Sequence, residues 1–176
     1  QIHLFCHDQL TESDQFALST VVKDVDKFFH LQYTNTRLEQ PKNWKFGAIG
    51  SKSMLNKRLA TQPNQPLADE GYAITISPDG IFWWAETERG YFYACQTVRQ
   101  LLRIHRVNNE LPTAVIVDYP DMPMRGIHDD YGRNQLPTMD DHKRTIETMA
   151  LFKLNTYIFY IEPDHIVYDF DPTIGC

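Results

Sequence analysis

Two closely spaced prolines, Pro120 and Pro123, place the strongest constraint on how this chain can fold. Proline fixes its own backbone φ and has no N–H to donate, so residues 118–123 resist both a helix and a central strand. Charge changes at the same place. Residues 1–117 hold 12 acidic and 12 basic side chains, whereas residues 118–176 hold 11 acidic and 5 basic ones. The whole net charge of −6 therefore lies after the break, which predicts two parts with different roles.

The first part, residues 1–117, is predicted to be an α+β domain in which two helices cover one face of a sheet. Thr11 and Asp14 have the spacing of a capped helix start, and apolar residues then recur at helical spacing as far as Phe29. A second apolar stripe predicts a helix over residues 90–104. Residues 34–43 and 51–70 are predicted loops. The expected strands are residues 2–6, 44–49, 72–77, 81–85 and 113–117.

The clearest local signal is a hairpin. Asp79 and Gly80 form a turn between two runs rich in β-branched and aromatic residues. Neighbouring residues of a strand point to opposite faces, so at least one of Trp83 and Trp84 is expected in the core.

After the break the pattern predicts one β/α/β unit, with a strand at residues 124–129, a helix over about residues 139–152 and a strand at residues 155–161. Units of this kind build parallel sheets. A single unit cannot cover both faces of such a sheet. We therefore expect further sequence or a partner to complete it.

Composition disfavours several classes of protein and site. The negative charge offers no electrostatic surface for nucleic acid, and no apolar run reaches the roughly 18 residues of a membrane span. The three cysteines are far apart and form no CxxC motif, so neither a disulfide framework nor a zinc site is indicated; Cys95 is expected to be a small buried apolar residue. The clusters at residues 128–130 and 162–165 fit no standard metal site, so neither a metal nor a cofactor is expected. No signal peptide is visible, and a periplasmic or secreted location is expected only if one has been removed.

Two groups of motifs then resemble one family. Gly71-Tyr72, the hairpin, and the run from Gly90 to Leu102, which reads GYFYACQTVRQLL, are similar to the second, non-catalytic domain of family 20 glycoside hydrolases. The following residues resemble the start of that family's catalytic barrel: Ile116–Asp121 (IVDYPD), Arg125-Gly126, Asp130, Arg133 and Lys153-Leu154-Asn155. The resemblance covers residues 70–162 well, and residues 1–69 only by the order of elements.

The resemblance implies a β-N-acetylhexosaminidase with a (β/α)8 barrel, acting on a glycan that contains N-acetylhexosamine. In that family the acetamido group of the substrate attacks the anomeric carbon while a Glu donates a proton and an adjacent Asp steadies the acetamide, which departs from the usual two-carboxylate scheme. The family's Asp-Glu pair follows a later barrel strand, and no such dipeptide occurs in residues 118–176. We therefore expect no catalytic residue in this chain, an inactive 176-residue fragment, and the rest of the barrel in the intact protein.

Three residues are predicted to bind substrate. Arg125 matches an arginine that the resemblance assigns to sugar hydroxyls, a task that suits the fixed fork of guanidinium donors; its alternative role is an ion pair with a nearby aspartate. Asp130 is a weaker candidate, because it could form a structural ion pair or a rim contact with Arg133. Glu162 stands at the carboxyl end of the second strand, where barrel ligands bind, and its alternative is a solvated loop acid. Asn134 occupies a position at which the family often has His.

Other functions stay open. Residues 153–158 also resemble the second barrel strand of family 84 O-GlcNAcase-like hexosaminidases, which carry an Asp-Asp pair just after it; here the sequence is Glu162-Pro163-Asp164. A fragment of an α-glucuronidase is a related possibility. A non-catalytic carbohydrate-binding or interaction module is the alternative from a different class.

Overall fold

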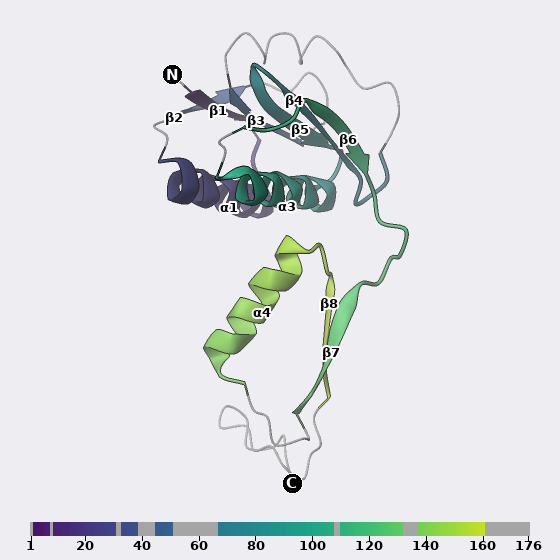
Figure 1. The fold of residues 1–176 in the computed structure, drawn as a ribbon. Helices are drawn as coiled ribbons and strands as arrows, with labels where there is room; N and C mark the ends of the chain where they lie inside the picture. The colour runs from purple at the N-terminus through teal and green to yellow at the C-terminus, as the bar shows by residue number, and fades with distance from the viewer. Residues whose placement is uncertain are drawn as a thin grey trace. The chain divides into compact units, whose positions relative to one another are not determined.

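The computed structural model describes residues 2–7, 9–30, 33–38, 45–50, 67–107, 110–131 and 137–160. The chain divides into two compact units, Gln1–Asp121 and Met122–Cys176. The division falls within the proline-marked segment, between Pro120 and Pro123 (Figure 1).

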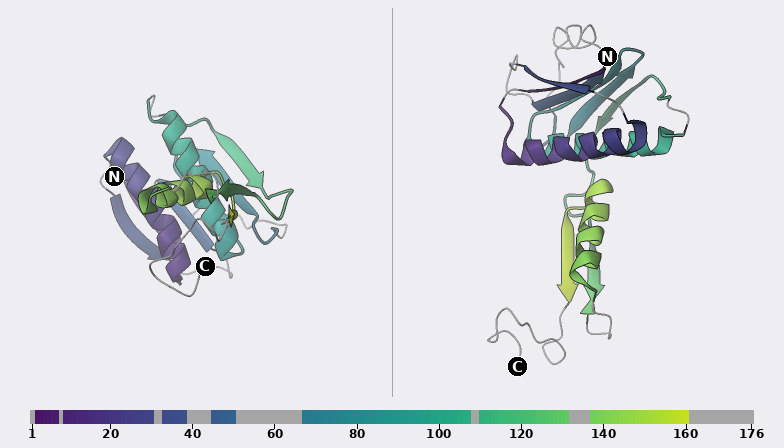
Figure 2. Two further views of the ribbon diagram at one scale, coloured as in Figure 1. Left: turned by 90° about the horizontal axis from the view of Figure 1, so that it is seen from below. Right: turned by 90° about the vertical axis from the view of Figure 1, so that its left-hand side faces the viewer.

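The described residues of the first unit form six strands and two helices: β1 (Ile2–His7), α1 (Glu12–Phe29), β2 (Tyr33–Leu38), β3 (Lys45–Gly50), β4 (Tyr72–Ser77), β5 (Gly80–Ala85), α3 (Glu88–His105) and β6 (Ala114–Asp118). The strands form one sheet in the order β2-β1-β3-β5-β4-β6. β1 and β2 run parallel, and the other neighbouring pairs are antiparallel. Figures 1 and 2 show both helices against the same face of this sheet, which confirms the predicted α+β domain.

Both helices begin at capping residues. The Thr11 side chain accepts from the backbone N–H of Asp14, and the Asp14 side chain accepts in return from the N–H of Thr11, so the predicted capping box is confirmed. Helix α1 ends at Phe29, and its C-cap residue His30 has a left-handed φ of 49°. In α3, Thr87 caps the backbone N–H of Gly90. A Cβ at Gly90 would collide with the Gly71 carbonyl oxygen, so glycine lets the helix approach the sheet this closely.

Apolar side chains are buried on both faces of the sheet. The main core fills the space between the sheet and the helices and includes Trp83, Tyr91 and Cys95, all fully buried. On the opposite face a smaller cluster comprises Phe5, Phe46, Ala48, Ala73, Phe82 and Trp84, with Leu67 packed against it. Trp83 and Trp84 thus lie on opposite faces and both are core residues, and the prediction for Cys95 is confirmed.

One predicted loop is wrong. Residues 33–38 form β2, an edge strand parallel to β1, whereas the sequence pattern predicts an irregular segment over residues 34–43. The sequence YTNTRL has little apolar alternation, so it lacks the pattern from which a strand is predicted. Of the expected loop at residues 51–70, residues 51–66 lie outside the described residues, and residues 67–70 form neither helix nor strand.

The second unit is a β/α/β unit, as predicted: β7 (Gly126–Asp130), α4 (Met139–Leu151) and β8 (Thr156–Tyr160). β7 and β8 pair in parallel, with Gly126 opposite Thr156 and Asp130 opposite Tyr160. Thr138 and Asp141 form a capping box at the start of α4. None of the helices within the described ranges is long and apolar enough to cross a lipid bilayer.

Candidate functional site

The carboxyl edge of β7 and β8 is the candidate site. Tyr157 and Phe159 face α4, because both contact His142 on that helix. Residues of a strand alternate between faces, so Ile158 and Tyr160 of β8 point to the opposite side. By the same alternation Asp129, which bonds to Tyr157, faces α4.

The face away from α4 therefore carries polar groups at its carboxyl end. Asp130 and Tyr160 are register partners and the last residues of their strands. His128 lies on the same face, with its ring centroid 6.1 Å from that of Tyr160. A carboxylate beside an aromatic ring and an imidazole can accept hydrogen bonds from sugar hydroxyls and offer an apolar surface to a sugar face. Because Asp129 points the other way, the run at residues 128–130 does not converge on one point as metal ligands would.

Arg125 lies at the opposite edge of this pair of strands. It directly precedes β7, and its guanidinium donates to two backbone carbonyls: Nε to Lys153 at 3.0 Å and Nη1 to Met122 at 2.7 Å. Its backbone N–H donates to Asn155 Oδ1 at 2.9 Å, and its carbonyl accepts from the N–H groups of Asn155 and Thr156. The hydrogen bonds of Arg125 thus link the amino ends of β7 and β8.

Of the predicted substrate residues, the two that the structure describes, Arg125 and Asp130, are therefore not brought together. The five residues of β7, at about 3.3 Å each, separate Arg125 from the carboxyl edge by roughly 16 Å. Asp130 lies at that edge. Glu162, Arg133 and Asn134 lie outside the described residues. Tyr160 was missed by the sequence analysis, although its position two residues before Glu162, in a period-two strand, was a usable signal.

In the first unit, three residues of the family motifs, Tyr72, Thr97 and Asp118, form hydrogen bonds between different elements. The Tyr72 hydroxyl contacts Thr97 Oγ1 at 2.6 Å and donates to Asp118 Oδ2, which joins β4, α3 and β6. Burial, followed by the carboxylate of Asp118, raises the pKa of Tyr72 well above its ordinary value. These contacts give Tyr72 and Thr97 a structural role.

Two buried carboxylates of α1, Asp24 and Asp14, link that helix to other elements of the unit. Asp24 of α1 accepts from Arg103 through both oxygens and from Arg99 Nε at 2.9 Å, which ties α1 to α3. Asp14 Oδ2 accepts from Lys45 Nζ at 2.6 Å and lies 3.2 Å from His7 Nε2. Both clusters link elements of the same unit and serve its packing.

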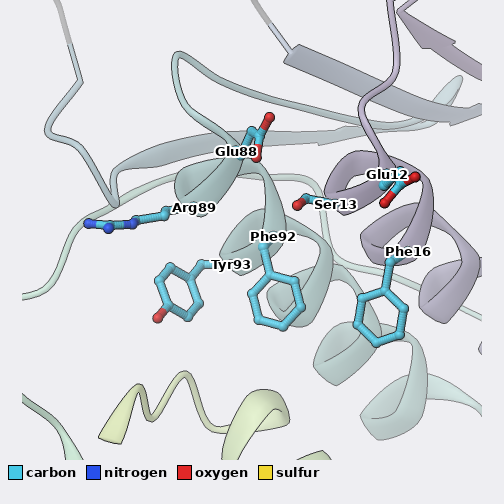
Figure 3. A pocket seen from close by; sticks show the side chains of 7 residues that line it. All are labelled: Glu12, Ser13, Phe16, Glu88, Arg89, Phe92 and Tyr93. Atoms are coloured by element: carbon cyan, nitrogen blue, oxygen red, sulfur yellow. The ribbon is translucent and has the colours of Figure 1, made fainter.

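A groove of about 490 Å³ lies between the first turns of α1 and α3. Figure 3 shows its lining residues: Glu12, Ser13, Phe16, Glu88, Arg89, Phe92 and Tyr93. Arg89 is paired with Asp69 at 2.9 Å, and the Phe16 ring is 61% exposed. The groove is therefore an aromatic surface with a charged rim.

Comparison with known proteins identifies the family. Residues 2–119 match the family model "Glycosyl hydrolase family 20, domain 2", which is more than half of the chain. The chain therefore belongs to glycosyl hydrolase family 20.

Relatives and a solved structure agree with this assignment. A β-hexosaminidase of Porphyromonas gingivalis is 32% identical over 106 residues, 56% of this chain and 14% of that protein. A β-hexosaminidase of Akkermansia muciniphila is 31% identical over 98 residues, 55% of this chain and 20% of that protein. The fold is similar to that of a GH20 exo-β-N-acetylglucosaminidase from Vibrio harveyi, with a TM-score of 0.57 and 16% identity over 90% of this chain and 24% of that one. The chain thus spans a fifth or less of these two curated relatives.

Proposed function

We propose that this chain is part of a β-N-acetylhexosaminidase, with residues 1–117 as its accessory domain and residues 118–176 as the start of a catalytic (β/α)8 barrel. The match to domain 2 carries the proposal, because the two relatives described above are both named β-hexosaminidases. The structural alignment covers 90% of the chain, whereas the first unit holds 121 of its 176 residues, so the alignment extends into the second unit.

A barrel would supply partner strands for the edges of β7 and β8 and side chains to cover their face away from α4. Among the described residues β7 and β8 pair only with each other, and Ile158 and Tyr160 are nearly half exposed on the face away from α4. A closed ring of parallel strands pairs every edge and fills its interior with side chains. The rest of such a barrel is the partner we expect for this unit.

The reaction would be retaining hydrolysis of a terminal β-linked N-acetylhexosamine. The acetamido oxygen of the substrate bonds to the anomeric carbon as the glycosidic bond breaks, a Glu protonates the leaving oxygen, and water then opens the cyclic intermediate. An adjacent Asp orients the acetamide. Neither member of that pair is assigned to residues 118–176, which contain no Asp-Glu dipeptide. The 176-residue chain alone is therefore expected to be inactive.

Within this chain, the carboxyl edge of β7 and β8 would contribute to sugar binding. The Asp130 carboxylate would accept hydrogen bonds from sugar hydroxyls, and Tyr160 would offer its ring. Glu162 is assigned the same role from its position in the sequence alone. Arg125 stays a predicted sugar ligand, and its Nε and Nη1 also donate to backbone carbonyls at the amino edge. Active sites of these barrels form at the carboxyl edge.

The test compares two proteins: the product of the complete reading frame that contains this chain, and the 176-residue chain by itself. With an aryl N-acetyl-β-glucosaminide as substrate, the first should release the aryl group and the second should show no release above buffer. In the complete protein, Asp130→Asn should raise KM roughly tenfold or more, the cost of a lost charge-assisted hydrogen bond. The control Asp140→Asn, on an exposed α4 residue, should leave KM unchanged. Sugar binding without hydrolysis by the complete protein would contradict the proposal in favour of a carbohydrate-binding module.

A further inference from the structure

A chain of hydrogen bonds joins the three elements of the second unit on the α4 side. Tyr157 Oη donates to Asp129 Oδ2 at 3.1 Å, and Tyr157 Oη lies 3.0 Å from Tyr131 Oη. Tyr131 Oη in turn lies 3.1 Å from Nδ1 of His142 on α4. Four side chains from β7, its carboxyl end, α4 and β8 therefore form one connected network.

Aromatic rings pack against this network. Tyr131 follows the last residue of β7 and is only 7% exposed. Its ring centroid lies 5.5 Å from that of His142 and 5.6 Å from that of Phe159, while the Phe159 centroid is 4.2 Å from that of Tyr157. Rings at these separations attract each other beyond simple burial. The carboxyl end of β7 is thus anchored to both α4 and β8.

The proton count of the network limits its arrangements. Tyr157 gives its only hydroxyl proton to Asp129. The proton of Tyr131 can be directed to Tyr157 Oη, to His142 Nδ1 or to the Asp129 carboxylate, with which Tyr131 also interacts. In the first and third arrangements, the approach at 3.1 Å is a hydrogen bond only if His142 carries a proton on Nδ1. Burial, then the bond to Tyr157, raises the pKa of Tyr131, so its hydroxyl keeps its proton at neutral pH. The tautomer of His142 therefore reports whether Tyr131 donates to it.

The network holds both neighbours of Asp130 in the chain. Asp129 and Tyr131 are each fixed on the α4 side, so the backbone between them has little freedom to turn Asp130 away from the opposite face. On β8, Phe159 packs within the network and precedes Tyr160, the register partner of Asp130. Fixing these positions restricts where the Asp130 carboxylate and the Tyr160 ring can lie.

We propose that Tyr131, His142 and Tyr157 are positioning residues that hold Asp130 and Tyr160 in place for sugar binding. The inference rests on the proposed function, because it names the residues that support that site. All three act through the strands and do not touch the sugar. Removing a supporting hydrogen bond behind a binding site lowers the preorganisation of that site, which weakens binding even when every direct interaction with the ligand is still present.

The experiment uses the complete protein and two variants that each remove one hydroxyl, Tyr157→Phe and Tyr131→Phe. Each should raise KM for an aryl N-acetyl-β-glucosaminide roughly three- to tenfold with kcat within about twofold, since one hydrogen bond is removed and the reacting groups are untouched. The double variant should cost no more than the larger single one, because both hydroxyls belong to the same network. The imidazole ¹⁵N shifts of His142 should change in Tyr131→Phe, reporting an altered tautomer.

Met149→Ala is the matched control, because Met149 is buried on α4 and belongs to none of these hydrogen bonds. It should lower the melting temperature but leave KM and the His142 shifts unchanged. An unchanged KM in Tyr157→Phe, or an equal rise in Met149→Ala, would overturn the inference while leaving an active enzyme and hence the proposed function intact. If the complete wild-type protein is inactive, the proposed function fails and the sugar-binding role fails with it. The His142 shifts then decide whether the network itself exists.

Discussion

The two units of this chain bury their apolar side chains to very different extents. The first encloses a core between its sheet and helices and a second cluster on the opposite face. In the second, the buried apolar side chains among the described residues are Tyr131 and Met149, while Ile146, Phe152 and Ile158 are each at least 45% exposed. A mixed sheet with two helices can satisfy its own surfaces, whereas a parallel pair of strands with one helix cannot.

Charge separates the two units in the same way. In the first, carboxylates such as Asp24 are buried against arginines of another element. In the second, the described ion pairs of α4 join residues three apart on an exposed surface, such as Asp140 and Lys143, where such pairs add little stability. The first unit therefore uses charge to connect its elements, whereas these pairs of the second unit stay within one helix.

The largest difference should appear when the units are made separately. Residues 1–121 alone should unfold in one cooperative transition, because both of their clusters lie within that unit. Residues 122–176 alone should show no cooperative transition, since so few of the apolar side chains described in that unit are buried. Circular dichroism during heating measures both. A sharp melt from residues 122–176 would contradict our description of that unit as incomplete.

The next largest effect is expected from removing a buried charge in the first unit. Asp14→Ala would leave Lys45 without its partner at 2.6 Å and His7 without its acceptor. Breaking a buried pair on one side costs about 3–5 kcal/mol of unfolding free energy, measurable by urea denaturation. Asp26→Ala changes an exposed aspartate of the same helix and should cost less than about 0.5 kcal/mol. Similar losses in both variants would show that the effect comes from α1 and not from the buried pair.

Lowering the pH should weaken the same contacts of Asp14 by protonating its carboxylate, without any substitution. Burial raises the pKa of Asp14, but hydrogen bonds from His7, Lys45 and Thr11 outweigh it and lower the pKa from 3.8 to about 2. Because the folded pKa is the lower one, this contribution is complete above pH 3.8 and is lost as the pH falls toward 2. It amounts to about 2 kcal/mol. Stability measured against pH should therefore fall less steeply for Asp14→Asn than for the wild type, and parallel curves would refute the assignment.

A smaller loss is expected for Tyr72→Phe. The change removes the hydroxyl that contacts Thr97 and Asp118 while keeping the buried ring. Loss of these bonds should cost about 1–2 kcal/mol, again by urea denaturation. Tyr119→Phe removes an equal hydroxyl from a ring that is 60% exposed, and we expect its effect to stay within about 0.5 kcal/mol. Equal losses of unfolding free energy in the two variants would mean that Tyr72 stabilises the unit through its buried ring and not through its hydroxyl.

Local chemistry made much of the fold predictable. The capping box at Thr11 and the Asp79-Gly80 turn each depend on a few adjacent residues, so the sequence specified them directly. Strand β2 could not be found this way. Its residues are paired at the edge by β1, and pairing between distant segments leaves no periodic signal in a polar strand.

The candidate site was predictable only in part. The strand pattern ended the first strand at residue 129, one residue before the end of β7, and Asp130 itself was assigned by motif. Arg125 was assigned by motif, but its direction and partners depend on the carbonyls of Lys153 and Met122. Lys153 follows α4, so its carbonyl reaches Arg125 only once the β/α/β unit has folded. The network around Tyr131 was equally invisible, because its members come from three elements.

The bond between Tyr72 and Asp118 has a mechanical consequence. Asp118 is the last residue of β6, and the chain leaves the first unit just beyond it. Any pull that the second unit transmits along the connecting segment must enter the sheet at this residue. Its side chain is linked there to β4 and, through Thr97, to α3. The load would thus pass into three elements at once and would not simply peel one edge strand from the sheet.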